Sequence, residues 1–309
     1  METLTKQLYQ AACQSSLSRL QSLLQQGADP NAEWRGYPPL HALTFPNPHK
    51  PVNHTADSFA CIDVLLAHGA DPHLPGGFPR TSVYFLAAFA GAASIVARLR
   101  AAKGKADPLF AAAEGKLRQY DPLSRDAYGF LPLHYVAGSR IGGSGLLKVA
   151  TRLLDAGADP NAEDLARKHR VTPIYLAGNA GQRDMFELLL SRGANPEQAL
   201  TNAMWNAPDF EVYGRLALAH GANIDRATAN GKPLLNHLIQ WGRLRHATWL
   251  LNHGASPLVK DKDGWTALHQ AASRGNARMI ETLLAHGADP TAKDKLGHTP
   301  ADVDSISRR

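Results

Sequence analysis

The sequence predicts an all-α solenoid of about nine repeated helix-turn-helix units with inserted loops. Three observations carry this prediction: a recurring glycine motif that ends helices, a second motif that starts them, and the interval between successive copies. Copies of the glycine motif, Gly-Ala-Asp-Pro and its variants, begin at Gly27, Gly69, Gly157, Gly193, Gly221, Gly254 and Gly287. The last two intervals are both 33 residues (254 − 221 and 287 − 254), which sets the base period.

The glycine motif marks the end of a helix. Each copy follows an amphipathic run, such as 61–66 before Gly69 or 280–284 before Gly287. Glycine adopts a left-handed backbone conformation without steric cost, and the proline that follows prevents the helix from continuing. Leu283 and Leu284, in the most regular of these helices, are both expected in the core.

The second motif marks a helix start about 12 residues after the glycine. It appears as Pro39-Leu40-His41, Pro132-Leu133-His134 and Thr266-Ala267-Leu268-His269. Threonine is a favourable N-cap and proline a favourable first helical residue, so both predict a start at this point.

Two short helices per 33 residues, with openings of this type, resemble the ankyrin repeat. The resemblance covers nearly the whole chain and is most specific between Asp263 and Pro290. It implies β-turn fingers between repeats, a concave face lined by the first helices and the fingers, and a convex back of second helices. It also implies that His41, His134 and His269 tie the helix opening to nearby backbone and have no catalytic role.

The resemblance implies one ankyrin-repeat domain over residues 1–309. Helices at 4–13 and 17–26 are expected to cap one end, and a short helix near 300 the other. The expected units are 1–30, 31–72, 73–107, 108–160 with an insertion, 161–196, 197–224, 225–257, 258–290 and the cap 291–309.

Departures from the period predict loops at three places. Residues 44–54 are rich in proline and histidine, and residues 138–145 contain glycines that favour a mobile loop. The segment 105–128 is expected to hold a short helix over 109–119. The unit 197–224 is five residues short and should lack a finger. Such insertions often contact a partner, although neutral drift of surface loops explains them as well.

Composition limits the partners. Lys and Arg number 33 against 27 Asp and Glu, with a net charge of +6 and a pI near 9.3. This mild excess favours an acidic partner surface, whereas a nucleic-acid binder would show a denser basic stripe. Cys13 and Cys61 are too few for a disulfide framework and are expected to be buried and reduced, as in the cytoplasm. No secretory signal or membrane-spanning stretch is expected.

Catalytic, metal and cofactor chemistry is not predicted. The 14 histidines show no close His/Cys spacing of the kind that structural zinc requires. The glycine-dense stretch 142–145 lacks the Gly-Lys-Ser/Thr ending of a phosphate-binding loop. We therefore expect a non-enzymatic chain without cofactor, monomeric when unbound, that binds a partner protein on its concave face and its inserted loops.

The predicted partner-binding residues combine aromatic and basic side chains, which dominate the energetics of protein interfaces. Any one aromatic could instead pack between adjacent repeats. The predicted set is Trp34, Tyr37, Phe130, Tyr135, Arg140, Arg167, Lys168, Arg170, Trp241, Lys262, Trp265 and Arg274.

Two narrower functions stay open at this level. The protruding loops would suit a stoichiometric inhibitor, immunity-like or antitoxin-like, that occludes the active site of an enzyme. The pI would suit nucleic-acid binding, which the scattered acidic residues disfavour. Salt titration separates the nucleic-acid alternative, because phosphate binding weakens by orders of magnitude over a modest rise in salt.

Overall fold

The computed structural model describes residues 3–44, 55–72, 74–76, 81–103, 108–116, 121, 123, 125, 129–164, 171–228 and 231–307. They form two compact units, Met1–Ala194 and Asn195–Arg309, each described by itself below. The single domain over 1–309 stays a prediction. The expected loop at 44–54 lies, apart from Thr44, outside the described residues.

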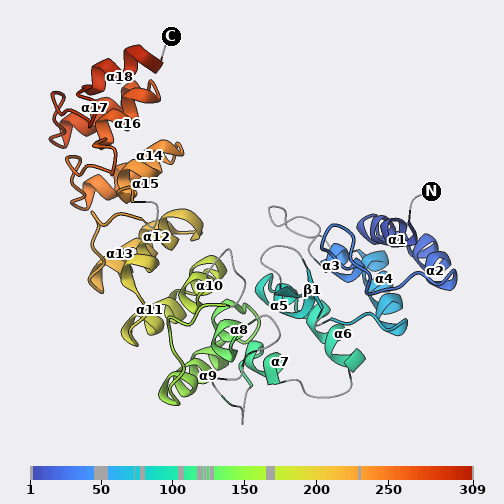
Figure 1. Cartoon of the computed structure of the whole chain (residues 1–309). Helices are drawn as coiled ribbons and strands as arrows, with labels where there is room; N and C mark the ends of the chain where they lie inside the picture. Colours follow the sequence, from blue (N-terminus) through green and yellow to red (C-terminus); the bar gives the residue numbers. More distant parts are fainter. Residues whose placement is uncertain are drawn as a thin grey trace. The chain divides into compact units, whose positions relative to one another are not determined.

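The first unit consists of helices that pack in successive pairs along the chain, such as α1 with α2, α8 with α9 and α10 with α11 (Figure 1). Its first helices pack on one another, as α1 does on α3 and α8 on α10. A hairpin of two residues per strand, β1 (Pro75–Gly76) and β2 (Thr81–Ser82), precedes α5. The helices are α1 (Leu4–Cys13), α2 (Leu17–Gln25), α3 (Pro39–Thr44), α4 (Ala56–Ala67), α5 (Val83–Phe89), α6 (Ala93–Lys103), α7 (Pro108–Ala113), α8 (Pro132–Gly138), α9 (Ser144–Asp155), α10 (Pro173–Ala180) and α11 (Arg183–Ser191).

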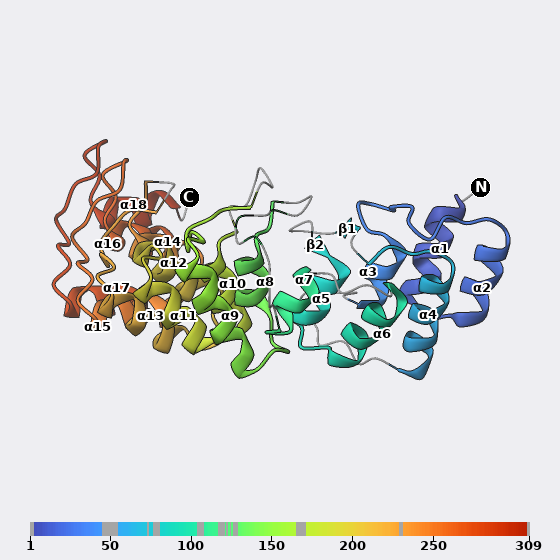
Figure 2. The same cartoon turned by 90° about the horizontal axis from the view of Figure 1, so that it is seen from below.

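The second unit is more regular. Its helices are α12 (Pro196–Asn206), α13 (Phe210–Ala219), α14 (Leu234–Gln240), α15 (Leu244–Asn252), α16 (Ala267–Ser273), α17 (Ala277–Ala285) and α18 (Pro300–Ser307). Figure 2 shows α12, α14, α16 and α18 on one side, which we name the first-helix layer. Helices α13, α15 and α17 lie on the other side and form the second-helix layer. Because each helix buries one apolar stripe, the core of this unit lies between the two layers.

The predicted helix ends are confirmed. All seven glycines of the repeat motif named above have a left-handed backbone, with φ between 84° and 93°. The helix starts are confirmed as well: the side chains of Thr172 and Thr266 accept hydrogen bonds from the backbone N–H groups of Tyr175 and His269. These caps satisfy backbone groups that a helix terminus leaves without a partner.

The expected role of the opening histidines is confirmed at His134, whose ring bonds Leu131 and Val171, and at His269. The Nδ1 atom of His269 lies 2.8 Å from the Thr266 hydroxyl, and its Nε2 lies 3.1 Å from the carbonyl oxygen of His298 in the next turn. Asn236 occupies the same place in its own repeat and donates to the carbonyl of Trp265 at 3.0 Å. An asparagine therefore replaces the histidine while keeping the link between adjacent repeats.

The unit predicted to lack a finger does lack one. Asn195 accepts hydrogen bonds from the backbone N–H groups of Glu197 and Gln198 and caps α12 directly. Pro196, which elsewhere in the motif follows a helix, here becomes the first residue of the next one. The boundary between the two compact units falls at this position.

One prediction about the insertions needs correction. The helix expected over 109–119 is shorter and ends at Ala113, where Lys116 and Gly115 close the last turn onto Ala111 and Ala112. Glycines of 138–145 allow close packing against this helix end, and the expected mobility of that segment stays a prediction. A Cβ atom at Gly145 would lie 2.7 Å from the carbonyl oxygen of Gly115, too close for any side chain.

Burial was expected for both Leu283 and Leu284 and for both Cys13 and Cys61, and in each pair one residue is exposed instead. Leu283 is fully buried, whereas Leu284 is 43% exposed, because consecutive helical residues point about 100° apart. Cys61 is buried, whereas Cys13, the last residue of α1, is exposed; both thiols are free. Among the described residues, no helix is long and apolar enough to cross a membrane.

Candidate functional site

An aromatic cluster lies at the ends of α12 and α14 in the second unit. We name Trp205, His237, Trp241 and Arg243 the Trp241 cluster. The ring of Trp205 lies 5.1 Å from that of His237 and 6.5 Å from that of Trp241, edge to face with the latter. The guanidinium of Arg243 sits 4.9 Å from the centre of the Trp205 ring, a cation–π arrangement.

Local sequence explains why Trp241 is exposed. Helix α14 ends at Gln240, and Trp241 is its C-cap: its backbone N–H donates to the carbonyl of His237, and the N–H of Gly242 donates to the carbonyl of Ile239. Gly242 then turns left-handed at φ 72°, so the chain leaves the first-helix layer directly after the tryptophan. Trp241 is 65% exposed, more than any other large aromatic side chain among the described residues.

Basic side chains extend the cluster toward α16. Lys232 Nζ donates to the Gln240 side chain at 3.1 Å, and Arg274 donates to the Gln240 backbone carbonyl. Burial, and then the charge of Lys232, lowers the pKa of His237, so this ring is neutral near pH 7. The cluster therefore combines a large apolar surface with three cations, Lys232, Arg243 and Arg274, on neighbouring repeats.

The first unit holds a second aromatic patch. Trp34 and Tyr37 pair across a two-residue turn, with backbone hydrogen bonds of 3.0 and 3.1 Å. Both central residues, Arg35 and Gly36, have positive φ, which is the geometry of a type I′ hairpin turn. Tyr9 of α1 lies 5.2 Å from Trp34, and Arg35 lies 4.5 Å above the same ring. The hydrogen-bonded turn and the contact with Tyr9 therefore fix the positions of Trp34 and Tyr37 on the finger.

Several predicted residues also link repeats. Trp265 is half-buried, and its indole N–H donates to Asp294 of the next finger at 3.2 Å. Arg140 is exposed, yet its guanidinium donates to the carbonyls of Ala180 and Asn179, at the end of α10, at 2.8 and 2.9 Å. Arg274 does the same for α14, as described above. Cations stabilise helix C-termini, so these side chains support the fold as well as the surface.

The prediction is corrected at Phe130 and Tyr135. They are only 2% and 3% exposed and pack in an aromatic core around Phe85, whose ring lies 5.6 and 5.2 Å from theirs. Neither has surface to offer a partner. Lys262 is exposed, as expected. Arg167, Lys168 and Arg170 lie outside the described residues.

Trp205, His237 and Arg243 were missed by sequence reasoning. Trp241 precedes its repeat glycine by 13 residues (254 − 241), whereas Trp205 precedes Gly221 by 16 (221 − 205). The missing finger and the longer α12 shift Trp205 along the repeat, so spacing alone does not match it to Trp241. Counted from the helix ends instead, both tryptophans lie next to a last helical residue: Trp205 precedes Asn206 of α12, and Trp241 follows Gln240 of α14.

The cluster offers aromatic faces and cationic groups, the side chains that dominate the energetics of protein interfaces. In the part of the chain that the structure describes, no three His, Cys, Asp or Glu residues are grouped as metal ligands. The predicted absence of metal, cofactor and enzymatic activity stays a prediction.

Comparisons with known proteins agree with this geometry. A family model described as "Ankyrin repeats (3 copies)" matches residues 200–294, and the single "Ankyrin repeat" model matches 128–165 and 169–202. A crystal structure of the ankyrin repeat domain of Bcl-3, described as a unique member of the IkappaB protein family, is similar at 25% identity and a TM-score of 0.50. The match covers 73% of this chain and 97% of that one. No curated protein sequence matches the chain. Together, the repeat models span more than half of the sequence, and the chain belongs to the ankyrin-repeat family.

Proposed function

We propose that this protein is a non-enzymatic interaction module that binds a partner protein on the first-helix layer of its second unit, with Trp241 as the anchor. Ankyrin repeats generally mediate interactions between proteins, which supports the coarse function. The observation that carries the finer proposal is the 65% exposure of Trp241 beside a second tryptophan and three cations.

Exposure of a tryptophan to water is unfavourable, and burying it against a partner recovers a large apolar area. The rigid support of Trp241 by Trp205 and His237 reduces the side-chain entropy lost on binding. The surrounding Lys232, Arg243 and Arg274 favour an acidic partner surface and accelerate its approach. The protein is proposed to act as a monomer in the cytoplasm, which its two free thiols fit.

The test compares Trp241→Ala with Leu296→Ala. Leu296 is 80% exposed in the last finger, so its replacement removes exposed apolar surface outside the cluster. A partner captured by the unchanged chain should be purified and its affinity measured for both variants. We expect Trp241→Ala to weaken binding by more than about 2 kcal/mol, roughly 30-fold in Kd, and Leu296→Ala by less than about twofold. If both variants bind the partner with the same affinity, Trp241 does not contribute to the interface.

The effect of binding on the partner is tested separately from the location of the binding surface. An inhibitor that occludes an enzyme should abolish the activity of its purified partner at a one-to-one ratio, whereas a scaffold should leave that activity unchanged. For the nucleic-acid alternative, the affinity for an oligonucleotide should fall by orders of magnitude between about 50 and 200 mM salt. A partner protein held through Trp241 should show a much weaker salt dependence.

A further inference from the structure

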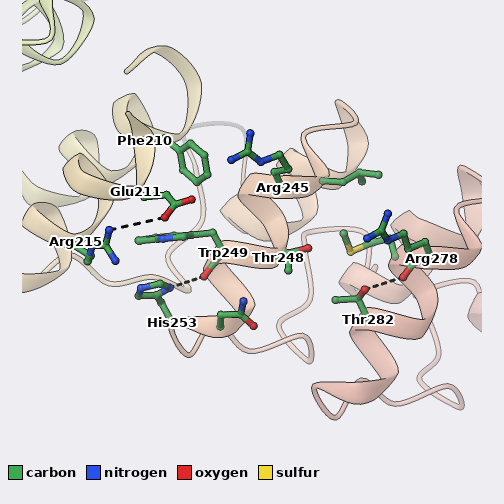
Figure 3. A pocket seen from close by; sticks show the side chains of 12 residues that line it. Phe210, Glu211, Arg215, Arg245, Thr248, Trp249, His253, Arg278 and Thr282 are labelled. Atoms are coloured by element: carbon green, nitrogen blue, oxygen red, sulfur yellow. Dashed lines mark hydrogen bonds and ion pairs between the residues drawn. The ribbon is translucent and has the colours of Figure 1, made fainter. Parts of the chain in front are cut away.

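The second-helix layer of the second unit contains a groove that the Trp241 cluster does not use. It lies across α13, α15 and α17, and 12 residues line it (Figure 3). Its volume is about 550 Å³, which is in the range of sites that bind small molecules or short peptide segments.

The floor of the groove is aromatic and apolar. Trp249 of α15 is only 6% exposed, and its ring edge occupies the space that Gly214 of α13 leaves: a Cβ atom there would lie 2.6 Å from the indole. Phe210 packs edge to face with this ring at 6.2 Å, and His253 stacks on it at 3.8 Å. Met279 of α17 continues the apolar lining. Because residue 214 is a glycine, the indole of Trp249 can pack closely between α13 and α15, where it forms the floor of the groove.

The rim of the groove is positively charged. Arg215, Arg245 and Arg278 come from three successive second helices, and Glu211 is the one acidic residue in the lining (Figure 3). Glu211 lies 3.9 Å from Arg215. Within the described parts of the chain, no carboxylate lies within ion-pair distance of Arg245 or Arg278. Burial, and then the charges of Arg243 and Arg245, lowers the pKa of the neighbouring His246, which is consistent with a positive potential here.

We propose that this groove binds an acidic segment of a partner protein, which places one apolar side chain against the half-buried Leu244, above the Trp249 floor, and its carboxylates against Arg245 and Arg278. Charge complementarity selects the occupant. A basic segment would meet three arginines, and an uncharged apolar one would leave Arg245 and Arg278 without anions. Bidentate pairing of guanidinium with carboxylate supplies directional contacts on both sides of the apolar floor.

The test uses the whole chain and a short synthetic peptide of aspartate and glutamate with one central leucine. A peptide with asparagine and glutamine in place of the acids is the neutral control. The indole N–H resonance of Trp249, assigned from its loss in Trp249→Phe, reports directly on the floor of the groove. We expect the acidic peptide to shift this resonance and the neutral peptide to leave it unchanged.

Two kinds of variant distinguish binding in the groove from non-specific electrostatic attraction to a basic protein. The double variant Arg245→Glu with Arg278→Glu should weaken the affinity for the acidic peptide by about tenfold or more. Lys293→Glu with Lys295→Glu changes the net charge equally at exposed positions of the last finger and should weaken binding of the acidic peptide by less than about threefold. Thr248→Phe adds an apolar ring to the groove without changing charge and should also abolish the Trp249 shift. Circular dichroism of each variant checks that the helices remain.

Three results would overturn the proposal. The first is an acidic peptide that binds without moving the Trp249 resonance. The second is an equal loss of affinity in the two double charge reversals, which would indicate non-specific attraction. The third is a single-stranded oligonucleotide that moves the same resonance at lower concentration than the peptide, which would assign the groove to nucleic acid. None of these results depends on Trp241, so failure here leaves the proposed first-helix surface to its own test.

Discussion

The ring of His134 donates a hydrogen bond from Nε2 to the backbone carbonyl of Val171, across 3.2 Å. Its Nδ1 accepts the N–H of Leu131 at 3.1 Å, so the bonded ring is neutral and carries its proton on Nε2. The same side chain therefore orders the start of α8 and attaches it to the chain that leads into α10. Burial lowers the pKa of His134 to about 4 from its ordinary value of 6.5.

This histidine predicts a pH dependence of stability. Because the folded-state pKa lies below the unfolded one, its contribution is complete above about pH 6.5 and is lost as pH falls toward 4. Between about pH 7.5 and pH 5 the loss should be about 2 kcal/mol. The variant His134→Asn uses the residue that makes the equivalent bond at position 236 and should remove this part of the dependence.

Urea denaturation at the two pH values measures the difference. Asparagine fills less space against Phe130, whose ring lies 5.2 Å from that of His134, so the variant is expected to be less stable at neutral pH. The readout is therefore the change in unfolding free energy between the two pH values. The same change in the variant and the unchanged chain would contradict a buried neutral histidine.

The core of the last repeats gives a second prediction. Leu283→Ala should destabilise the second unit by about 2–5 kcal/mol, because Leu283 is fully buried in α17. Leu284→Ala is the matched control on the same helix and should change stability by less than about 0.5 kcal/mol. Hydrogen exchange should show lost protection in the neighbouring repeats and little change in the first unit, since repeats stabilise their nearest neighbours. A uniform loss along the whole chain would argue against this locality.

The close approach of the two insertions gives a third prediction. Gly145→Ala would place a methyl group 2.7 Å from the backbone oxygen of Gly115 and should destabilise the first unit by about 1–3 kcal/mol. Gly178→Ala, also in a helix, would meet the Phe186 ring at 3.4 Å and should be neutral or slightly stabilising. Thermal unfolding of both variants checks this. If Gly145→Ala is as stable as Gly178→Ala, the two insertions do not pack as the structure shows.

The sequence predicted the repeat architecture because that information lies along the chain. Glycines at helix ends and histidines at helix starts act on residues a few positions away or one repeat away, so their spacing can be read directly. The exposure of Trp241, at the end of its helix, could be expected for the same reason. Spacing did not distinguish Phe130, which is buried, from Trp241, which is exposed, because burial depends on which side chains meet across helices.

The remaining features depend on contacts that spacing does not encode. The place of Trp205 follows from a missing finger, and the groove follows from Gly214 facing Trp249 on the next helix pair. The packing of Gly145 on Gly115 joins two insertions that the sequence shows only as separate interruptions. Each requires the three-dimensional arrangement of helices from different repeats.

The central claim is that the partner contacts the first-helix layer at Trp241. The most direct measurement replaces one residue at a time with a photo-crosslinking phenylalanine analogue, at Trp241 and at the exposed Leu284 of α17 on the second-helix layer. The partner purified through the unchanged chain is added and irradiated, and the crosslinked fraction is compared. Strong crosslinking is expected from position 241, whatever the fraction from position 284, which lies on the layer that contains the groove. Crosslinking from 284 with none from 241 would contradict the central claim.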